Sequence, residues 1–406
     1  MTAFGLAAAR VVTCDPLVAG GLGVIEDGVV GIDAGLVAYV GSRAGAPAGL
    51  RVEELGDCVV TPGLVDAHTH ACWIGSRHAE YDARMRGDDY RAIALAEGGI
   101  LATHRAVAAS SEESLAGALA DRLRRMAALG VTTVEVKSGY GLDGVHEHKQ
   151  LAAIARASRR DGVPSVIPTL LALHALPPGA TDRTAFAARV ARELIPAVGA
   201  QRLARFVDAY VDAEAFTTAE ARAIGHAALA AGLGVRLHVG QFADVGGAEL
   251  AAELGAASAD HLEHVSATGI DALSRAGVAA VLLPIASFTL GQRPPPVEAL
   301  RSGGVRLVVA SDANPGTAPT ESLPLAMALA VRMYGLSSEE ALLGATRHAA
   351  AALGLSDRGM LRAGTRADLV VWDLPHEHAI VQPWGTSKTR SVRVEGREIA
   401  PGRARV

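Results

Sequence analysis

Two histidines one residue apart, His68 and His70, end a short apolar run in residues 61–70 (TPGLVDAHTH). Side chains two residues apart on a strand point to the same face, so both imidazoles can reach one point. Imidazole nitrogens at a strand end that opens into a cleft are typical ligands of a metal ion. Two imidazoles do not complete such a site, so we expect the rest of the chain to supply more ligands.

Further polar side chains stand where other short apolar runs end. They are Lys137 with Tyr140, His174, His238, His261 and Asp312. In a barrel of parallel strands, the residues of the active site lie at the C-terminal ends of the strands. Polar residues recur at strand after strand, which is more than chance placement would give. We therefore expect them to gather at one site.

His68, His70, His238 and Asp312 form the predicted metal-ligand set. Three neutral imidazoles and one carboxylate suit Zn²⁺ and also Fe²⁺, and they leave room for a bound water. The metal would lower the pKa of that water and supply a hydroxide nucleophile. Proton transfer needs a base that is not a ligand, and His261 is the choice. Any one histidine alone is as well explained as a hydrogen-bonded structural residue, and only their joint placement favours the metal.

Two other residues near these strand ends have open roles. In some binuclear barrel hydrolases a strand-end lysine is carboxylated and bridges two metals, which the sequence allows for Lys137 but does not require. Asp66 precedes the histidine pair by two residues and is a candidate for support behind it. The remaining histidines are interpreted as structural: His78, His104, His146, His148, His226, His264, His348, His376 and His378.

The elements that must position these residues alternate between short apolar runs and helical segments. Besides the run before His68, strands are expected at residues 132–136, 165–170, 206–210, 235–238, 258–261, 279–283 and 306–310, with helices at about 112–129 and 219–231. Eight such steps predict a closed (β/α)8 barrel, a TIM-like α/β fold, over residues 61–355. A doubly wound open sheet is the rival, but no GxGxxG follows an early strand, which weakens its nucleotide-binding version.

Both chain ends have a different character. Residues 1–60 and 356–406 contain short β segments broken by glycine turns, for example at 29–32, 36–40, 367–372 and 391–394. We expect the two ends to pair in one small β-sandwich domain, which is discontinuous in sequence because the barrel is inserted between its halves.

Composition limits the classes of partner. The 406 residues carry a formal net charge of only -5, which gives no reason to expect nucleic acid or an anionic membrane as a partner. No apolar stretch is long and uninterrupted enough to span a membrane. Cys14, Cys58 and Cys72 are scattered without a CxxC pair, which fits a reducing cytoplasm. We expect no signal peptide, because no basic segment followed by an apolar core opens the sequence.

Two segments resemble the amidohydrolase superfamily: residues 62–70, which match its first metal motif, and residues 364–371 (GTRADLVV), which match its returning β segment. A finer resemblance, in order over nearly the whole chain, is to the imidazolonepropionase family. It is carried by residues 75–77 (GSR), 135–142 (EVKSGYGL), 258–262 (SADHL), 282–284 (LLP) and 312–317 (DANPGT). The stretch KSGYGL is the most specific of these.

The resemblance implies a reaction of histidine degradation. Metal-activated water would attack the ring amide carbonyl of 4-imidazolone-5-propanoate and open the ring to N-formimidoyl-L-glutamate. One Zn²⁺ or Fe³⁺ per chain would be held by the same four ligands, with Lys137 as a non-ligand. The family also suggests a homodimer whose only other partner is the small substrate.

Substrate contacts are likewise implied by the resemblance. Arg77 falls where the propionate is met, and a guanidinium fork suits a carboxylate. Tyr140, His174, Asn314, Gly316 and Thr317 fall at other contact positions, and His174 would donate to the ring carbonyl oxygen. As alternatives, Arg77 is a surface ion-pair residue, and Tyr140 and Asn314 shape turns.

Three positions depart from the family pattern. Gln241 stands where some members have glutamate, and an amide cannot be a general base, although it can hydrogen-bond a ring N–H or the attacking water. Ala172 replaces a glycine, and Thr317 stands where serine is common. The last two changes are mild.

Two further classes of function stay open at this point. A related metal-dependent deaminase or dihydropyrimidinase-type ring hydrolase would share the metal motif, and a second metal would favour its lysine-bridged form. A non-catalytic barrel that acts as a scaffold would be recognised by a lost ligand, but all four ligand positions are filled.

Overall fold

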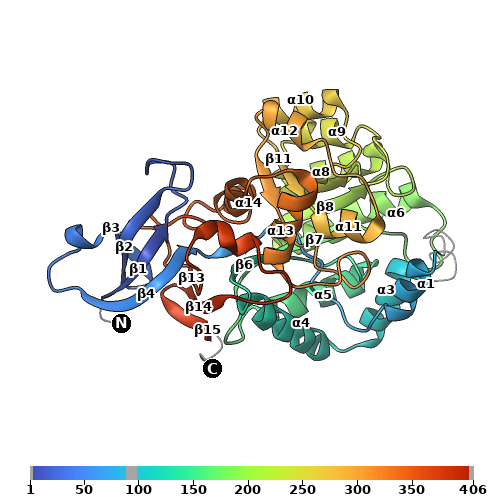
Figure 1. Cartoon of the computed structure of the whole chain (residues 1–406). Helices are drawn as coiled ribbons and strands as arrows, with labels where there is room; N and C mark the ends of the chain where they lie inside the picture. The colour runs from blue at the N-terminus through green and yellow to red at the C-terminus, as the bar shows by residue number, and fades with distance from the viewer. Residues whose placement is uncertain (1–2, 88–97, 402–406) are drawn as a thin grey trace.

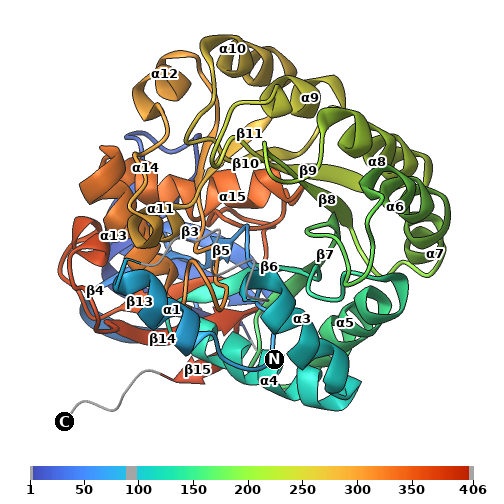
Figure 2. The same cartoon turned by 90° about the vertical axis from the view of Figure 1, so that its right-hand side faces the viewer.

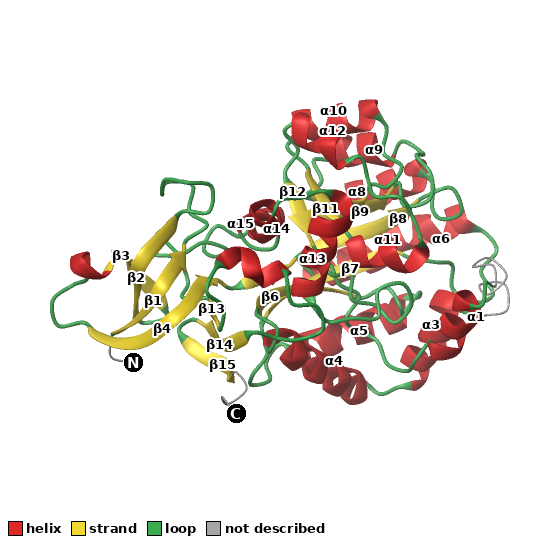
Figure 3. Cartoon of the chain, in the orientation of Figure 1, coloured by secondary structure: helices red, strands yellow, loops and turns green. Residues whose placement is uncertain are grey.

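The computed structural model describes residues 3–87 and 98–401 of the chain. Two parts lie side by side: a small β sheet, drawn mostly in blue and red, and a larger body of strands and helices (Figure 1). Colouring by secondary structure shows that the small part consists mostly of strands, whereas helices cover the strands of the larger part (Figure 3). No helix among the described residues is long and apolar enough to cross a membrane.

The larger part contains eight parallel strands that are hydrogen-bonded in chain order. They are β5 (Leu64–Asp66), β6 (Val131–Lys137), β7 (Ser165–Leu173), β8 (Phe206–Val211), β9 (Gly234–Val239), β10 (Ser258–His261), β11 (Ala279–Leu282) and β12 (Leu307–Val309). Seen from the side remote from the small sheet, the helices surround these strands (Figure 2). The predicted barrel is confirmed, and all eight predicted strands occur within a few residues of their expected bounds.

The barrel closes between its first and last strands through contacts just beyond their ends. Ser311 donates to the Asp66 carboxylate from its backbone N–H (3.1 Å) and from its hydroxyl (2.5 Å). The backbone N–H of Asp312 donates to the carbonyl of His68 at 3.1 Å, and that of His70 to the carbonyl of Ala313 at 3.0 Å. The segments that carry three predicted ligands are therefore fixed to each other.

Helices cover the barrel and fill the connections between its strands. They are α1 (His78–Met85), α3 (Gly99–Ala109), α4 (Glu112–Ala127), α5 (Gly144–Ala157), α6 (Arg183–Arg189), the π-helix η2 (Val190–Leu194), α7 (Ile195–Ala200), α8 (Thr218–Ala230), α9 (Gly247–Glu253), α10 (Ala267–Ala276), α11 (Pro284–Leu290), α12 (Val297–Ser302), α13 (Leu323–Tyr334), α14 (Ser338–Gly344) and α15 (Arg347–Ala352). The helices expected at 112–129 and 219–231 correspond to α4 and α8.

The small part is built from both chain ends, as the sequence predicted. Its seven strands are hydrogen-bonded into one continuous mixed sheet, where a sandwich was expected. Its order is β15 (Arg397–Pro401), β14 (Thr389–Val394), β13 (Leu369–Trp372), β4 (Arg51–Pro62), β1 (Phe4–Val12), β2 (Val24–Asp33) and β3 (Leu36–Ser42). The short helices η1 (Arg43–Gly45) and η3 (Glu377–Val381) flank it. Because β4 leads directly into β5, the sheet lies at the opposite end of the barrel from the strand ends that carry the site (Figure 1).

Candidate metal centre and active site

Four predicted ligands converge at the C-terminal end of the barrel. The Nε2 atom of His70 lies 3.3 Å from that of His68 and 3.2 Å from that of His238. An oxygen of Asp312 lies 3.5 Å from the Nε2 atoms of both His68 and His70. All four side chains are buried.

These separations fit a single metal ion. Ligand atoms about 2.0–2.1 Å from a tetrahedral Zn²⁺ are about 3.3–3.4 Å apart. Neutral imidazoles whose three Nε2 lone pairs face one another gain nothing from that arrangement unless a cation stands between them. The donor set of three nitrogens and one carboxylate oxygen suits Zn²⁺ and iron alike.

Two carboxylates fix the ring orientation of the ligands from behind. Nδ1 of His68 donates to Asp260 at 2.6 Å, and Nδ1 of His238 donates to Asp208 at 3.0 Å. A proton held at Nδ1 leaves Nε2 unprotonated, and such support behind a ligating histidine raises its basicity. Neither carboxylate was among the predicted site residues. Their signal was a charged residue inside an apolar strand, which must be paired when it is buried.

Behind the carboxylates lie two buried cations. The Lys137 ammonium is 2.8 Å from Glu135 and 2.9 Å from Asp208, and Arg236 donates to Asp260 at 3.1 Å. Burial lowers the pKa of Lys137, but Asp208 and Glu135 raise it by more, so the amine stays charged. A charged, doubly paired lysine is a poor candidate for carboxylation, which supports its expected place outside the ligand set.

Burial controls protonation in the ligand layer. It lowers the pKa of His68, His70 and His238, so the rings are neutral at neutral pH. Burial also raises the pKa of Asp312 to about 7, although His261 lowers it in part. Neutral imidazoles are the form in which histidine binds a metal.

His261 ends β10 beside the ligands, with its ring centroid 5.5 Å from that of His238. Its backbone is left-handed (φ 81°), as are those of Leu262 (φ 72°) and Asp312 (φ 55°). Left-handed conformations cost energy for residues other than glycine and concentrate at functional sites. Burial lowers the pKa of His261, but the carboxylates of Glu263, Asp312 and Asp260 together raise it by more.

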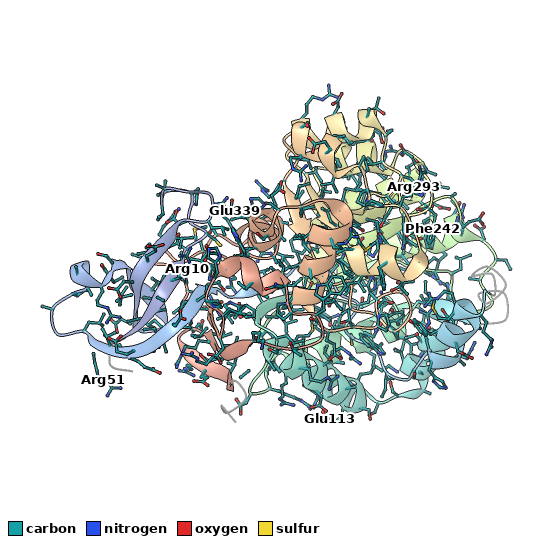
Figure 4. All side chains as sticks on the ribbon, viewed as in Figure 1. Arg10, Arg51, Glu113, Phe242, Arg293 and Glu339 are labelled. Atoms are coloured by element: carbon teal, nitrogen blue, oxygen red, sulfur yellow. The ribbon has the colours of Figure 1, made fainter. Side chains whose placement is uncertain are left out.

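One pocket brings the predicted ligands and contacts together. It is lined by His70, Arg77, Ile100, Tyr140, His174, Tyr210, His238, Gln241, Phe242, His261, Asp312, Asn314 and Thr317. Phe242, labelled in Figure 4, lies on the side of the barrel away from the small sheet. Neither the fully buried His68 nor the predicted contact Gly316 is among the lining residues, and Gly316 lies against the guanidinium of Arg77.

Arg77 is buried and held by two neighbours. Glu80 binds its guanidinium with both oxygens, the Nε contact being 2.8 Å, and also accepts from the backbone N–H of Gly99 at 2.8 Å. A Cβ at Gly316 would lie 2.4 Å from Nη1 of Arg77, so a larger residue there would displace the guanidinium. Arg77 does form an ion pair, with Glu80, but the pair is buried and Arg77 lines the pocket, so only the surface location of the alternative interpretation is wrong.

The loop that carries Tyr140 is shaped by helix α5. Glu147 accepts from the backbone N–H groups of Gly139 (2.7 Å) and Leu142 (2.6 Å), and Gln150 accepts from that of Tyr140 (3.0 Å). These contacts could not be predicted from the sequence, because a glutamate on a helix is ordinarily exposed. Glu147 is buried, and burial raises its pKa to about 7.

His174 offers the pocket a hydrogen-bond acceptor rather than the expected donor. Its Nδ1 lies 2.8 Å from the carbonyl oxygen of Gly139, and a carbonyl only accepts, so the proton is on Nδ1. Burial lowers the pKa of His174 to about 3. The neutral ring therefore offers Nε2 as an acceptor, whereas the sequence analysis expected it to donate.

Gln241 and Asn314 are also oriented by hydrogen bonds. Oε1 of Gln241 accepts from the Tyr210 hydroxyl at 3.0 Å, which leaves its amide N–H groups as donors. Oδ1 of Asn314 accepts from the backbone N–H groups of Gly316 (2.8 Å) and Thr317 (2.7 Å). Asn314 shapes this turn in addition to lining the pocket.

A second group of possible ligand atoms, His376, Glu377 and His378, lies on η3. Its carboxylate is already bound by both Nε and Nη2 of Arg10, at 2.7 and 2.8 Å; Arg10 is labelled in Figure 4. Neither histidine is buried. Among the described residues, the barrel cluster alone combines buried ligands with second contacts that fix them.

Comparison with known proteins places this chain. Residues 59–399 match the amidohydrolase family. An imidazolonepropionase from Acidiphilium cryptum is 47% identical over 90% of this chain and 92% of its own length. One from Methylobacterium sp. (strain 4-46) is 45% identical with the same coverage.

Solved structures agree on the fold. A zinc-bound adenosine deaminase from Xanthomonas campestris has a TM-score of 0.73 at 20% identity, covering 97% of this chain and 92% of that one. A triazine hydrolase variant has a TM-score of 0.74 at 17% identity, covering 99% and 95%. The chain belongs to the amidohydrolase family and, within it, groups with the imidazolonepropionases.

Proposed function

We propose that this protein hydrolyses 4-imidazolone-5-propanoate to N-formimidoyl-L-glutamate. One observation carries the proposal: a metal-ligand cluster and an oriented arginine line one pocket of a chain that is 43–47% identical to imidazolonepropionases. The metal held by the cluster would act on the ring carbonyl, and the arginine would bind the propionate.

His68, His70, His238 and Asp312 would hold the metal, as one Zn²⁺ or Fe³⁺ per chain. When bound, the metal supplies a Lewis acid that lowers the pKa of water and polarises the ring carbonyl. Every other requirement falls on the side chains of the pocket.

Arg77 binds the propionate with its planar fork and so fixes the ring. Nε2 of His174 accepts from a ring N–H, and the Gln241 amide donates to the carbonyl oxygen as it gains negative charge. Both roles follow from the hydrogen bonds that orient these two groups. Tyr140, Asn314 and Thr317 complete the wall around the substrate.

His261 is the proposed general base, and Asp312 can assist it. His261 takes a proton from the attacking water as the new C–O bond forms. It returns that proton to the ring nitrogen as the C–N bond of the ring breaks. The product keeps the formimidoyl group on nitrogen, and water is the sole co-reactant.

A turnover assay on freshly generated substrate tests this proposal. Loss of its ultraviolet absorbance should match the appearance of N-formimidoyl-L-glutamate by mass spectrometry. His261→Ala should lose turnover severely while metal content persists, and near-normal turnover would remove His261 from the base role. No turnover with metal present would overturn the proposed substrate and direct the search to other cyclic amides and amidines.

We further propose that the protein is a homodimer in the cytoplasm and that its only other partner is this small substrate. All three cysteines are buried, which agrees with a reducing compartment. Light scattering coupled to gel filtration tests the dimer, and cell fractionation tests the location. A monomeric mass would contradict the dimer without bearing on the reaction.

A further inference from the structure

Behind His261 lies a buried chain of polar groups from three elements. An oxygen of Glu263 lies 3.7 Å from Nδ1 of His261. The other Glu263 oxygen accepts from the Ser287 hydroxyl on α11 at 2.6 Å, and the Tyr334 hydroxyl at the end of α13 lies 2.6 Å from that of Ser287. His261 is the proposed base, and the other three side chains belong neither to the metal-ligand set nor to the predicted substrate contacts.

The donors in this chain all point toward Glu263. A carboxylate only accepts, so the Ser287 hydroxyl gives its single proton to Glu263. Tyr334 must then donate to Ser287. Hydrogen bonds arranged in series strengthen one another, so two hydroxyls stabilise the negative charge of Glu263 in a place where water does not reach it.

The atoms that face each other across the 3.7 Å gap are unsatisfied. Nδ1 of His261 and Oε2 of Glu263 are both buried and have no hydrogen-bond partner in the part of the chain that the structure describes. Leaving two such groups unpaired is costly, and a small rotation of either side chain joins them. The pair is therefore a hydrogen bond that is poised to close.

The backbone is bent so that this pair can form. His261 and Leu262 are both left-handed, which turns residue 263 back beneath the ring of residue 261. Leu262 donates to the carbonyl of Val239 at 3.1 Å, and His264 to that of Gly240 at 2.8 Å. The turn is thus fixed to the end of β9, next to the ligand His238.

We propose that Glu263, held by Ser287 and Tyr334, is a positioning residue that keeps the proton of neutral His261 on Nδ1. Nε2 is then left free to accept a proton in the pocket, by the logic of a carboxylate that orients a catalytic histidine. This inference rests on the proposed role of His261 as the base. It assigns the reaction a carboxylate that acts through the histidine and does not touch the substrate.

Kinetics of Glu263→Gln test the inference first. We expect kcat of the metal-loaded enzyme to fall by about tenfold to a thousandfold, within the range of acid–base catalysis, and KM to change less than about twofold. Ser287→Ala and Tyr334→Phe should lower kcat in the same direction but less. The control is Glu298→Gln, the same change on an exposed side chain of α12, which should leave kcat unchanged.

A double-mutant cycle separates positioning from general support. Glu263 acts through His261, so Glu263→Gln should lower the residual kcat of His261→Ala by less than about twofold. An equal fall in both backgrounds would overturn the inference. If Glu263→Gln does not fold, Tyr334→Phe serves in the same cycle, because it removes one hydroxyl and leaves the carboxylate in place.

The tautomer of His261 gives a readout that needs no substrate. The measurement is ¹⁵N NMR of the zinc-loaded protein with labelled histidine, and the signal of His261 is the one that disappears in His261→Ala. In the wild type this signal should report a proton on Nδ1. In Glu263→Gln the proton should shift toward Nε2. An unchanged tautomer in Glu263→Gln would contradict the inference. Failure of the wild type to turn over imidazolone propionate would instead contradict the proposed function. The tautomer measurement uses no substrate, so the two results can be told apart.

Discussion

The four metal ligands and the side chains behind them, here the ligand layer, are held in place differently from the surrounding pocket residues, here the rim. The rim comprises Arg77, Tyr140, His174, Gln241, Asn314 and Thr317, with Gly316 beside Arg77. In the ligand layer, His68 and His238 are fixed by carboxylates and then by Lys137 and Arg236, all through buried side chains on barrel strands. In the rim, Tyr140, His174 and Asn314 are positioned on loops through hydrogen bonds that involve the backbone.

Because of this difference, the residues that carry the reaction and those that recognise the substrate should respond differently to substitution. A strand end fixes a ligand within the hydrogen-bonded barrel, where a displaced atom weakens the metal site directly. A loop held by backbone contacts can differ in length and sequence while the barrel is unchanged. Changes in the ligand layer should therefore lower metal content and kcat, whereas changes in the rim should mainly alter KM.

Loss of a ligand should have the largest effect. His238→Ala removes one of the three converging Nε2 atoms and leaves Asp208 without its histidine. We expect metal content to fall well below one per chain and kcat/KM to fall by at least about a thousandfold. Elemental analysis with steady-state kinetics measures both. Full metal content in this variant would remove His238 from the ligand set.

Changing the support behind a ligand should cost less. Asp260→Asn keeps the shape of the side chain but removes the charge that faces His68 and Arg236. Metal affinity should fall by about tenfold to a hundredfold, as competition with a chelator would show. The melting temperature serves as control, because Arg236 loses its counter-charge. An unchanged affinity would mean that ring orientation comes from the strand alone.

In the rim, Arg77→Ala should raise KM by about tenfold to a hundredfold, which corresponds to the free energy of a hydrogen bond to a charged group. The change in kcat should be smaller. The substitution also leaves Glu80 buried without its cation, so the double variant with Glu80→Gln is the matched control. An unchanged KM in both variants would contradict the propionate contact.

The smallest effect is expected from Gly316→Ala. Its Cβ would lie 2.4 Å from Nη1 of Arg77, so the guanidinium must shift. We expect KM to rise about threefold to tenfold, because a small misplacement of a binding group weakens orientation. Gly117→Ala on α4 is the control, since its nearest neighbour would be 3.7 Å away. Equal kinetics for both variants would mean that the rim tolerates such a shift.

The sequence predicted the ligand layer better than its support or the rim. Strands buried on both faces read as continuous apolar runs, and a polar residue at their end is conspicuous, which identified His238 and Asp312. Asp208 and Asp260 also interrupt apolar runs, but their partners come from other strands and are known only once the barrel is closed. The donor role expected of His174 failed because its tautomer depends on the carbonyl of Gly139, 35 residues away.

Metal titration tests the central claim most directly. The metal-free protein, with His376→Ala and His378→Ala to remove the surface cluster, would receive increasing Zn²⁺ while turnover of imidazolone propionate is followed. The account predicts no activity without metal and a linear rise that ends at one equivalent per chain. Full turnover without metal, or a rise that continues to two equivalents, would contradict a single metal held by His68, His70, His238 and Asp312.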